Sequence, residues 1–100
     1  MTTPHDLHRV VVTGFGAVTP LGTGREALWE AALAGVSGAG PITQFDPSDI
    51  STSIACEVSD FDPGAYMDKR AVRRLDRFSQ FAVAATQLAL EDAALTVEGD

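Results

Sequence analysis

Residues 9–22 read RVVVTGFGAVTPLG, and most of what the chain reveals about its architecture starts from them. The run Arg9–Thr13 is β-branched at its centre and closed by Gly14, which is typical of a short strand buried on both faces of a sheet. The loop that follows is punctuated by glycines. Our interpretation of Gly14 and Gly16 is that they allow a tight turn against that sheet.

A helix is predicted directly after this loop. Thr23 and Glu26 have the spacing of a capping box, in which the hydroxyl covers a free helical N–H group and the carboxylate reaches back to the backbone. The helix runs to about Ala34, and Gly35 marks its end. A strand, a glycine loop and a helix in this order open a βα unit, so the predicted fold class is α/β.

The rest of the chain is predicted to contain one more strand and then helices. Residues 37–51 are rich in Gly, Pro, Ser and Asp and indicate a loop, whereas residues 53–58 alternate well enough for a strand. The sequence from 68 to about 93 is helical in pattern, as a short helix followed by a longer one. Residues 81–85 are apolar nearly all round the longer helix, so we expect a large neighbour to cover it.

The composition is that of an ordinary globular protein, with 45% hydrophobic and 21% charged residues. No apolar run approaches the ~20 residues of a membrane helix, so no membrane partner is expected. Residues 1–8 lack the basic start and apolar stretch of a secretory signal, and we expect them to form a disordered leader. A single cysteine cannot form an internal disulfide, which favours a reducing, cytoplasmic location.

Cys56 is the only thiol in the chain. A reactive thiolate requires a helix N-terminus or a cationic neighbour, whereas Cys56 is predicted to lie in the middle of the second strand, next to Glu57. We therefore interpret it as a buried packing residue rather than a nucleophile. His5 and His8 fall in the predicted leader. No catalytic residue and no metal site is predicted in the chain.

The pair Gly14 and Gly16 also invites comparison with a dinucleotide-binding loop. The third glycine, Gly22, comes six residues after Gly16 rather than three. In addition, no acidic residue follows at the position that would bind a ribose hydroxyl. We favour the structural interpretation of these glycines, and no cofactor is predicted.

The distribution of charge indicates a binding surface. The chain has seven basic and fourteen acidic residues, a net charge of −7, but residues 69–77 hold five cations and one anion, a local net charge of +4. Helical spacing predicts that these cations share one ridge, with Lys69, Arg73 and Arg77 aligned and Arg70 and Arg74 alongside. The alternative is that they pair with Asp68 and Asp76, but two acids cannot neutralise five cations. We therefore expect the ridge to dock an acidic partner.

Taken together, these segments resemble the N-terminal part of the β-ketoacyl-acyl carrier protein synthases, especially the synthase II type. The stretches that carry the resemblance are, in order, residues 9–22, Trp29–Gly38, Ile42–Asp46 and Arg73–Ala82. The similarity extends over nearly the whole chain from residue 9 to residue 95. Several ordered motifs at the family's spacing are far more specific than any one of them.

The resemblance implies the N-terminal part of a thiolase-like, layered αβαβα fold, in a protein that assembles as a homodimer. It also implies an acyltransferase of fatty-acid biosynthesis that condenses an acyl group with malonyl carried on acyl carrier protein, releasing carbon dioxide. In the family, a cysteine holds the acyl chain as a thioester and two histidines assist decarboxylation, and all three lie beyond the region matched here. Cys56 falls where the family usually has a small residue. We therefore expect residues 9–100 to be an incomplete N-terminal part that is inactive alone.

One function of the family maps onto this chain. The family receives its substrates from acyl carrier protein, a small acidic helical protein, partly through basic residues in the helix before the motif Arg73–Asp76. The matching positions hold Arg70, Arg73 and Arg74, in agreement with the charge pattern, and Lys69 lies next to them. These three arginines are the predicted binding residues for acyl carrier protein.

Two other hypotheses remain open at this point. A polyketide ketosynthase shares the same opening motifs, and a stand-alone, non-catalytic module that binds carrier protein would also explain the basic ridge. A nicotinamide-dependent oxidoreductase is disfavoured by the glycine spacing. Binding to nucleic acid is opposed by the net charge of −7.

Overall fold

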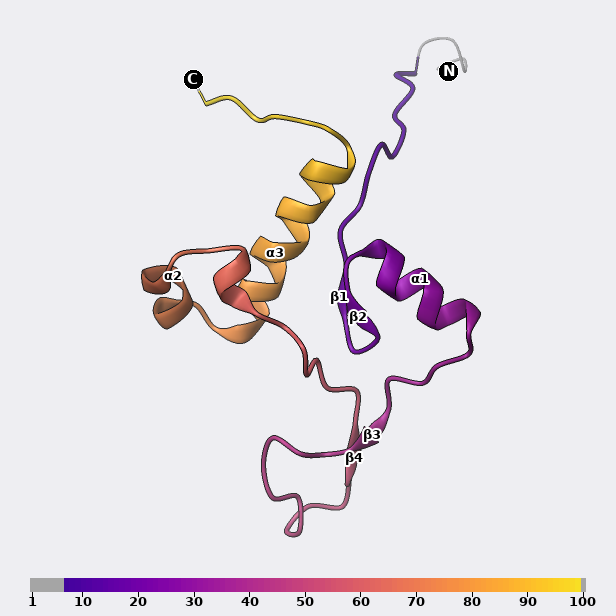
Figure 1. The fold of residues 1–100 in the computed structure, drawn as a ribbon, viewed down its shortest axis with the longest axis vertical. Helices are drawn as coiled ribbons and strands as arrows, with labels where there is room; N and C mark the ends of the chain where they lie inside the picture. Colours follow the sequence, from indigo (N-terminus) through magenta and orange to yellow (C-terminus); the bar gives the residue numbers. More distant parts are fainter. Residues whose placement is uncertain (1–6, 100) are drawn as a thin grey trace.

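The computed structural model describes residues 7–99 (Figure 1). The regular elements follow one another in the order β1 (Val18–Thr19), β2 (Gly22–Thr23), α1 (Arg25–Leu33), β3 (Gly40–Pro41), β4 (Ile54–Ala55), the 3-10 helix η2 (Pro63–Ala65), α2 (Lys69–Arg74) and α3 (Arg77–Asp92). The strands pair in two separate antiparallel ladders, β1 with β2 and β3 with β4. The predicted helix after the glycine loop and the predicted short and long helices after residue 68 are confirmed.

The elements are spread out rather than gathered round one core. The Cα radius of gyration is 18.2 Å, with extents of 58 × 35 × 29 Å, whereas a compact domain of this length has a radius of ~13 Å. Figure 1 shows the β3–β4 hairpin projecting below the helices. Among residues 7–99, the buried side chains are Phe61, Gln80 and Ala84. The apolar stretch at 81–85 therefore lacks, within the described chain, the large neighbour that its sequence predicts.

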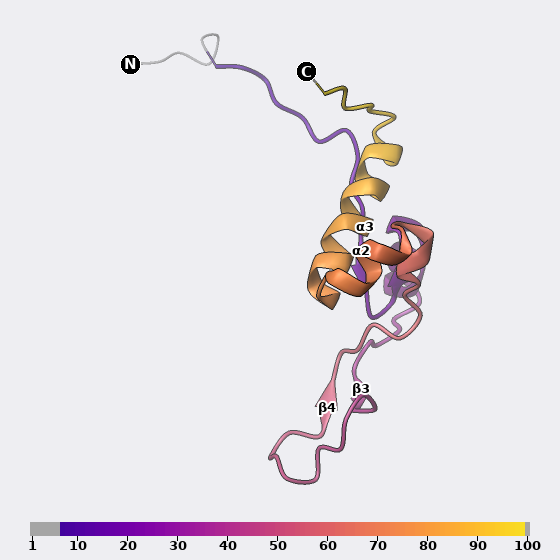
Figure 2. The same cartoon turned by 90° about the vertical axis from the view of Figure 1, so that its left-hand side faces the viewer.

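The predicted strand at Arg9–Thr13 does not form a ladder in the described part of the chain. Val10, Val11 and Val12 are 91%, 72% and 86% exposed, in an extended segment that leads toward α3 (Figures 1 and 2). The prediction of a strand buried on both faces is wrong for this structure. A β-strand requires a neighbouring strand to share its backbone hydrogen bonds, and no element within residues 7–99 pairs with this segment.

The glycine-rich loop contains a tight hairpin. β1 and β2 pair with Val18 opposite Thr23 and Thr19 opposite Gly22. The Thr19 hydroxyl donates to the Gly22 carbonyl at 3.0 Å and accepts from the Leu21 N–H group at 3.1 Å, which closes the turn. The chain therefore reverses direction before the helix begins. A dinucleotide-binding loop leads from its strand directly into the helix, so this geometry favours the structural interpretation of the glycines.

Helix α1 has a glycine at each end. Gly24 is the N-cap, with φ at 97°, and no side chain caps the helix. The predicted capping box of Thr23 and Glu26 is therefore wrong, because the helix starts at Arg25 and Glu26 is its second residue rather than its third. At the other end, Gly35 has φ at 71°, a left-handed conformation that glycine adopts without a steric penalty. The predicted stop at Gly35 is confirmed.

Residues 14–16 pack directly on helix α3. A Cβ atom at Gly16 would overlap the carbonyl oxygen of Ala85 and lie 2.8 Å from the Cβ atom of Leu88. A Cβ atom at Gly14 would lie 2.5 Å from the backbone nitrogen of Ala93. The glycines allow a close approach of two backbones, but the prediction of a tight turn against a sheet is wrong: the surface they approach is helix α3, and the tight turn lies further along, between β1 and β2.

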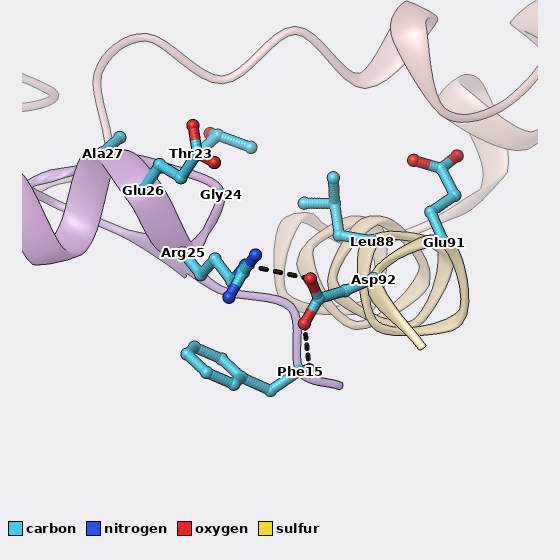
Figure 3. Close-up of a pocket in the computed structure, with 9 residues that line it drawn as sticks. All are labelled: Phe15, Thr23, Gly24, Arg25, Glu26, Ala27, Leu88, Glu91 and Asp92. Atoms are coloured by element: carbon cyan, nitrogen blue, oxygen red, sulfur yellow. Dashed lines mark hydrogen bonds and ion pairs between the residues drawn. The ribbon is translucent and has the colours of Figure 1, made fainter. Parts of the chain in front are cut away.

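Asp92, the last residue of α3, holds the same region together (Figure 3). Its carboxylate accepts the Phe15 N–H group at 3.0 Å and pairs with the Arg25 guanidinium at 2.9 Å. These contacts join α3 both to the glycine segment and to the first residue of α1. The Arg25 side chain is 51% exposed, so the ion pair contributes no more than ~1 kcal/mol of stability. Its main effect is to fix the relative orientation of the elements.

The β3–β4 hairpin is braced at its base by a side chain. The Glu57 carboxylate accepts the N–H group of Thr43 at 2.6 Å and its hydroxyl group at 3.0 Å. The strand predicted at residues 53–58 is reduced to the two residues of β4. Cys56 is exposed, so the prediction that it is buried is wrong. The hairpin projects away from the helices, and none of the described elements covers the thiol.

Replacing Gly16 with alanine is expected to destabilise the full-length protein, because the added methyl group has no space against Ala85 and Leu88. Overpacking of this kind costs ~1–3 kcal/mol of unfolding free energy, which lowers the melting temperature by several degrees. Thermal unfolding followed by circular dichroism measures the change. Gly40→Ala is the matched control, since a Cβ atom at Gly40 meets nothing within 4 Å. Equal melting temperatures for the two variants would contradict the contact.

Candidate functional site

Helix α2 presents a group of exposed cations. They are Lys69, Arg70, Arg73 and Arg74, and we call these four residues the α2 cationic surface. Within residues 7–99 the structure contains a single ion pair, which joins Arg25 to Asp92. None of the four cations is therefore held by a carboxylate of the described chain.

The acidic residues on either side of α2 are the N-cap residues of helices and do not pair with the cations of the described chain. Asp68 is the N-cap of α2, and its carboxylate accepts the Ala71 N–H group at 2.8 Å. Asp76 is the N-cap of α3, where a negative charge faces the positive end of the helix dipole. Pairing of the arginines with these two acids, the alternative to an open surface, does not occur among the described residues. The positive charge of α2 thus stays available to a partner.

Arg77 does not belong to this surface, although its spacing predicts that it does. The chain leaves the helical conformation at Leu75, where φ is −92° and ψ is 137°. The Arg77 guanidinium donates to the Val58 carbonyl and lies 5.1 Å from the centre of the Phe81 ring. The predicted ridge is therefore wrong at its last member, because the break interrupts the helical spacing. Asp76 is a favoured N-cap residue and is the sequence signal for that break.

Gln80 fixes the C-terminal end of α2, a role that sequence reasoning missed. The residue is 8% exposed, and its side-chain amide donates to the Val72 carbonyl at 3.0 Å and to the Leu75 carbonyl at 3.3 Å. Carbonyls in the last turn of a helix have no partner within that helix. One buried amide therefore satisfies two of them and ties α2 to α3. The signal in the sequence is a lone amide beside the apolar stretch 81–85.

An aromatic cluster fixes the other end of α2. The Phe61 ring stacks on Tyr66 with a centroid distance of 5.9 Å and meets Phe81 of α3 edge to face at 5.0 Å. Aromatic pairs in such arrangements contribute ~0.5–1.5 kcal/mol each beyond the area they bury. The cluster places η2 between α2 and α3, in contact with both (Figures 1 and 2). The α2 cationic surface is consequently held at both ends by α3.

The other candidate residues are not brought together. His8 is exposed in the extended N-terminal segment and Cys56 in the β3–β4 hairpin, while His5 lies with residues 1–6 outside the described chain. In the part that is described, no group of three or more His, Cys, Asp or Glu side chains is placed to hold a metal ion. None of the helices within residues 7–99 has the length and apolar character needed to span a membrane.

A concave region lies between α1 and α3. It is an open pocket of about 380 Å³ whose wall includes Phe15, Arg25 and Asp92 (Figure 3). Arg25, whose guanidinium is the one cationic group among the described residues of this wall, is already paired with Asp92 there. The remaining charged groups, Glu26 and Glu91, are acidic. We interpret this region as a junction between elements rather than a binding site.

A family model described as "Beta-ketoacyl synthase, N-terminal domain" matches residues 7–99. The chain belongs to the β-ketoacyl synthase family. A 3-oxoacyl-[acyl-carrier-protein] synthase 2 of Coxiella burnetii is 48% identical over 89 residues, which cover 89% of this chain and 22% of that relative. The protein of the same name from Synechocystis sp. is 46% identical over 89 residues, which cover 89% of this chain and 21% of that relative.

A solved structure supports the same placement. This β-ketoacyl synthase chain is similar to the structure titled "The ishigamide ketosynthase/chain length factor", with a TM-score of 0.77 and 44% sequence identity. The similarity covers 86% of this chain and 21% of that one. The predicted fold class, the N-terminal part of a thiolase-like α/β fold, is confirmed. The chain spans about a fifth of the length of these relatives.

Gln80→Glu is expected to loosen α2 in the full-length synthase, because a carboxylate cannot donate to the Val72 and Leu75 carbonyls. Because both hydrogen bonds are part-buried, leaving these carbonyls without a donor should cost about 1 kcal/mol, at the low end of the penalty for an unsatisfied buried group. Hydrogen–deuterium exchange read by mass spectrometry should show faster exchange of the α2 amides. Gln44→Glu, at an exposed loop position, is the matched control. Exchange in α2 that is no faster than in this control would contradict the role of Gln80.

Proposed function

We propose that this chain contributes to a 3-oxoacyl-[acyl-carrier-protein] synthase. Such an enzyme is an acyltransferase that condenses an enzyme-bound acyl group with malonyl carried on acyl carrier protein, with loss of carbon dioxide, in fatty-acid biosynthesis. The observation that carries the proposal is the 46–48% identity to proteins of that name over 89 residues. The proposed protein is cytoplasmic and homodimeric, with residues 1–8 as a leader ahead of the domain.

The reacting groups are proposed to lie outside these 100 residues. In the described chain, Cys56 lies on the projecting β3–β4 hairpin and His8 on the extended N-terminal segment. A nucleophilic cysteine is activated by a helix N-terminus, a cationic neighbour or a base within hydrogen-bond reach, and Cys56 lies on a strand hairpin rather than at a helix N-terminus. The exposed faces of Val10–Val12 and of α3 support a larger enzyme, because apolar surface of that extent is normally covered. In this proposal the chain supplies part of the scaffold and a docking surface, and the catalytic groups come from other parts of the enzyme.

The docking surface proposed here is formed by Arg70, Arg73 and Arg74. All three are exposed on α2, and none is paired with a carboxylate of residues 7–99. They concentrate positive charge on a chain whose net charge is −7. A patch of one sign on a protein of the opposite sign attracts and orients a partner such as acyl carrier protein, which is small and acidic.

A polyketide ketosynthase is the second candidate function. The specific observation in its favour is the likeness to the ishigamide ketosynthase/chain length factor at 44% identity. The two candidates can be separated by the product that the full-length protein forms from acyl and malonyl groups on acyl carrier protein. A stand-alone carrier-binding module is less well supported, because it leaves the exposed valines of residues 10–12 without a covering surface.

Reversing the charge of the docking residues is expected to impair the use of carrier-bound substrate. A single exposed ion pair is worth only ~0.2–1 kcal/mol, so Arg70→Glu, Arg73→Glu and Arg74→Glu are combined in one full-length variant. With malonyl-acyl carrier protein, kcat/KM should fall about tenfold at low salt. Added salt should reduce this difference, since charges are screened over ~10 Å at 0.1 M ionic strength.

Two controls separate docking from folding and chemistry. A minimal pantetheine-linked substrate has no carrier protein to dock, so the rate of the triple variant with it should be unchanged. Gln44→Glu adds a negative charge at an exposed loop position outside α2 and should leave both rates unchanged. Equal losses on both substrates would show that the three arginines support the fold instead, and no loss on either would show that they are only solvated.

A further inference from the structure

The α2 cationic surface borders an apolar groove. The groove lies between η2 and α2 and has a volume of about 660 Å³. Pro63, Met67 and Val72 contribute its apolar lining, and Lys69 and Arg73 stand on its rim. Arg70 and Arg74 do not line it. The four cations therefore divide into two that flank the groove and two that do not.

Two carboxylates also border the groove, and each is directed at the backbone. The Asp62 carboxylate accepts the Gly64 N–H group at 3.0 Å, and the Asp68 carboxylate accepts the Ala71 N–H group at 2.8 Å. Neither forms an ion pair with Lys69 or Arg73 in the structure of residues 7–99. Both acids thus cap helical turns, and the two cations on the rim are left for an external carboxylate.

We propose that this groove receives an apolar side chain from an acidic helix of the partner, while Lys69 and Arg73 bind carboxylates of the same helix. Lys69 and Arg73 are one helical turn apart, so their spacing matches acids three or four positions apart on another helix. An amphipathic helix seated in an apolar groove is a common mode of peptide recognition. This inference rests on the proposed function and deepens it: the cations attract the partner, and the groove fixes its register.

The test must separate apolar recognition from attraction between charges. Val72→Lys does so, because it adds a cation to α2 while it replaces the apolar wall of the groove. Charge alone predicts tighter binding of the acidic carrier, whereas apolar recognition predicts weaker binding. Removing one apolar side chain from a buried contact should raise the Kd for acyl carrier protein about tenfold. Ala65→Lys adds the same charge at an exposed position outside the groove and is the matched control.

The dissociation constant is measured on the full-length protein with purified acyl carrier protein at low salt. Met67→Gln, which keeps the length of the side chain and adds no charge, is measured in parallel. Val72 and Met67 are both half-buried, so agreement between two different substitutions shows that the effect belongs to the groove and not to one perturbed position. We expect both groove variants to bind the carrier more weakly than Ala65→Lys does. Turnover of the pantetheine-linked substrate should be unchanged in both, with melting temperatures close to that of the parent protein.

If both groove variants bind acyl carrier protein as tightly as the Ala65→Lys control does, the proposal that the groove binds the carrier is overturned. If the triple arginine variant still shows a lower kcat/KM with malonyl-acyl carrier protein in that case, the proposed docking function stands without a role for the groove. If neither set of variants affects the carrier, both proposals fall. Equal loss of carrier binding and of turnover with the pantetheine-linked substrate would show that Val72 and Met67 support the fold, which also overturns the groove.

Discussion

The approach of residues 14–16 to helix α3 is the contact on which the arrangement of the other elements depends. Two backbones come together there only because Gly14 and Gly16 carry no side chain. The Asp92 carboxylate then adds a bond to the Phe15 N–H group and an ion pair with Arg25. Residues from the start and the end of the described chain are thereby joined, and both α1 and the β1–β2 hairpin are positioned against the one long helix.

Helix α3 also determines where the positive charge of the chain is presented. Helix α2 is only six residues long, too short to be stable without tertiary contacts. Its C-terminal carbonyls are bound by Gln80, and its N-terminal side is linked through η2 to the pair of Phe61 and Phe81. The cations are therefore on a helix whose orientation is set by buried contacts, which is a requirement for docking a partner in one register.

The positions of the helices were predictable from local sequence patterns, although the N-cap of α1 and the break before Arg77 were not. Features that depend on distant residues were missed. Gly35 marks the end of α1 because its left-handed φ is a local property. The exposure of the Arg9–Thr13 segment depends on which strands lie beside it, which no local pattern reveals. The proposal of Arg70, Arg73 and Arg74 as docking residues rests on charge and spacing. The groove beside Lys69 and Arg73, however, depends on how η2 folds against α2. Gln80 was missed for the same reason: its acceptors lie on another helix.

The central claim, that α2 is where the carrier docks, can be tested by a chemical property of the sequence. Lys69 is the only lysine in these 100 residues, and a carbodiimide joins a lysine to a carboxylate only when the two are in contact. We predict that treatment of the full-length protein with acyl carrier protein yields a cross-linked peptide that contains Lys69, and that added salt suppresses it. Cross-links to lysines elsewhere in the protein, with none at Lys69, would contradict the account.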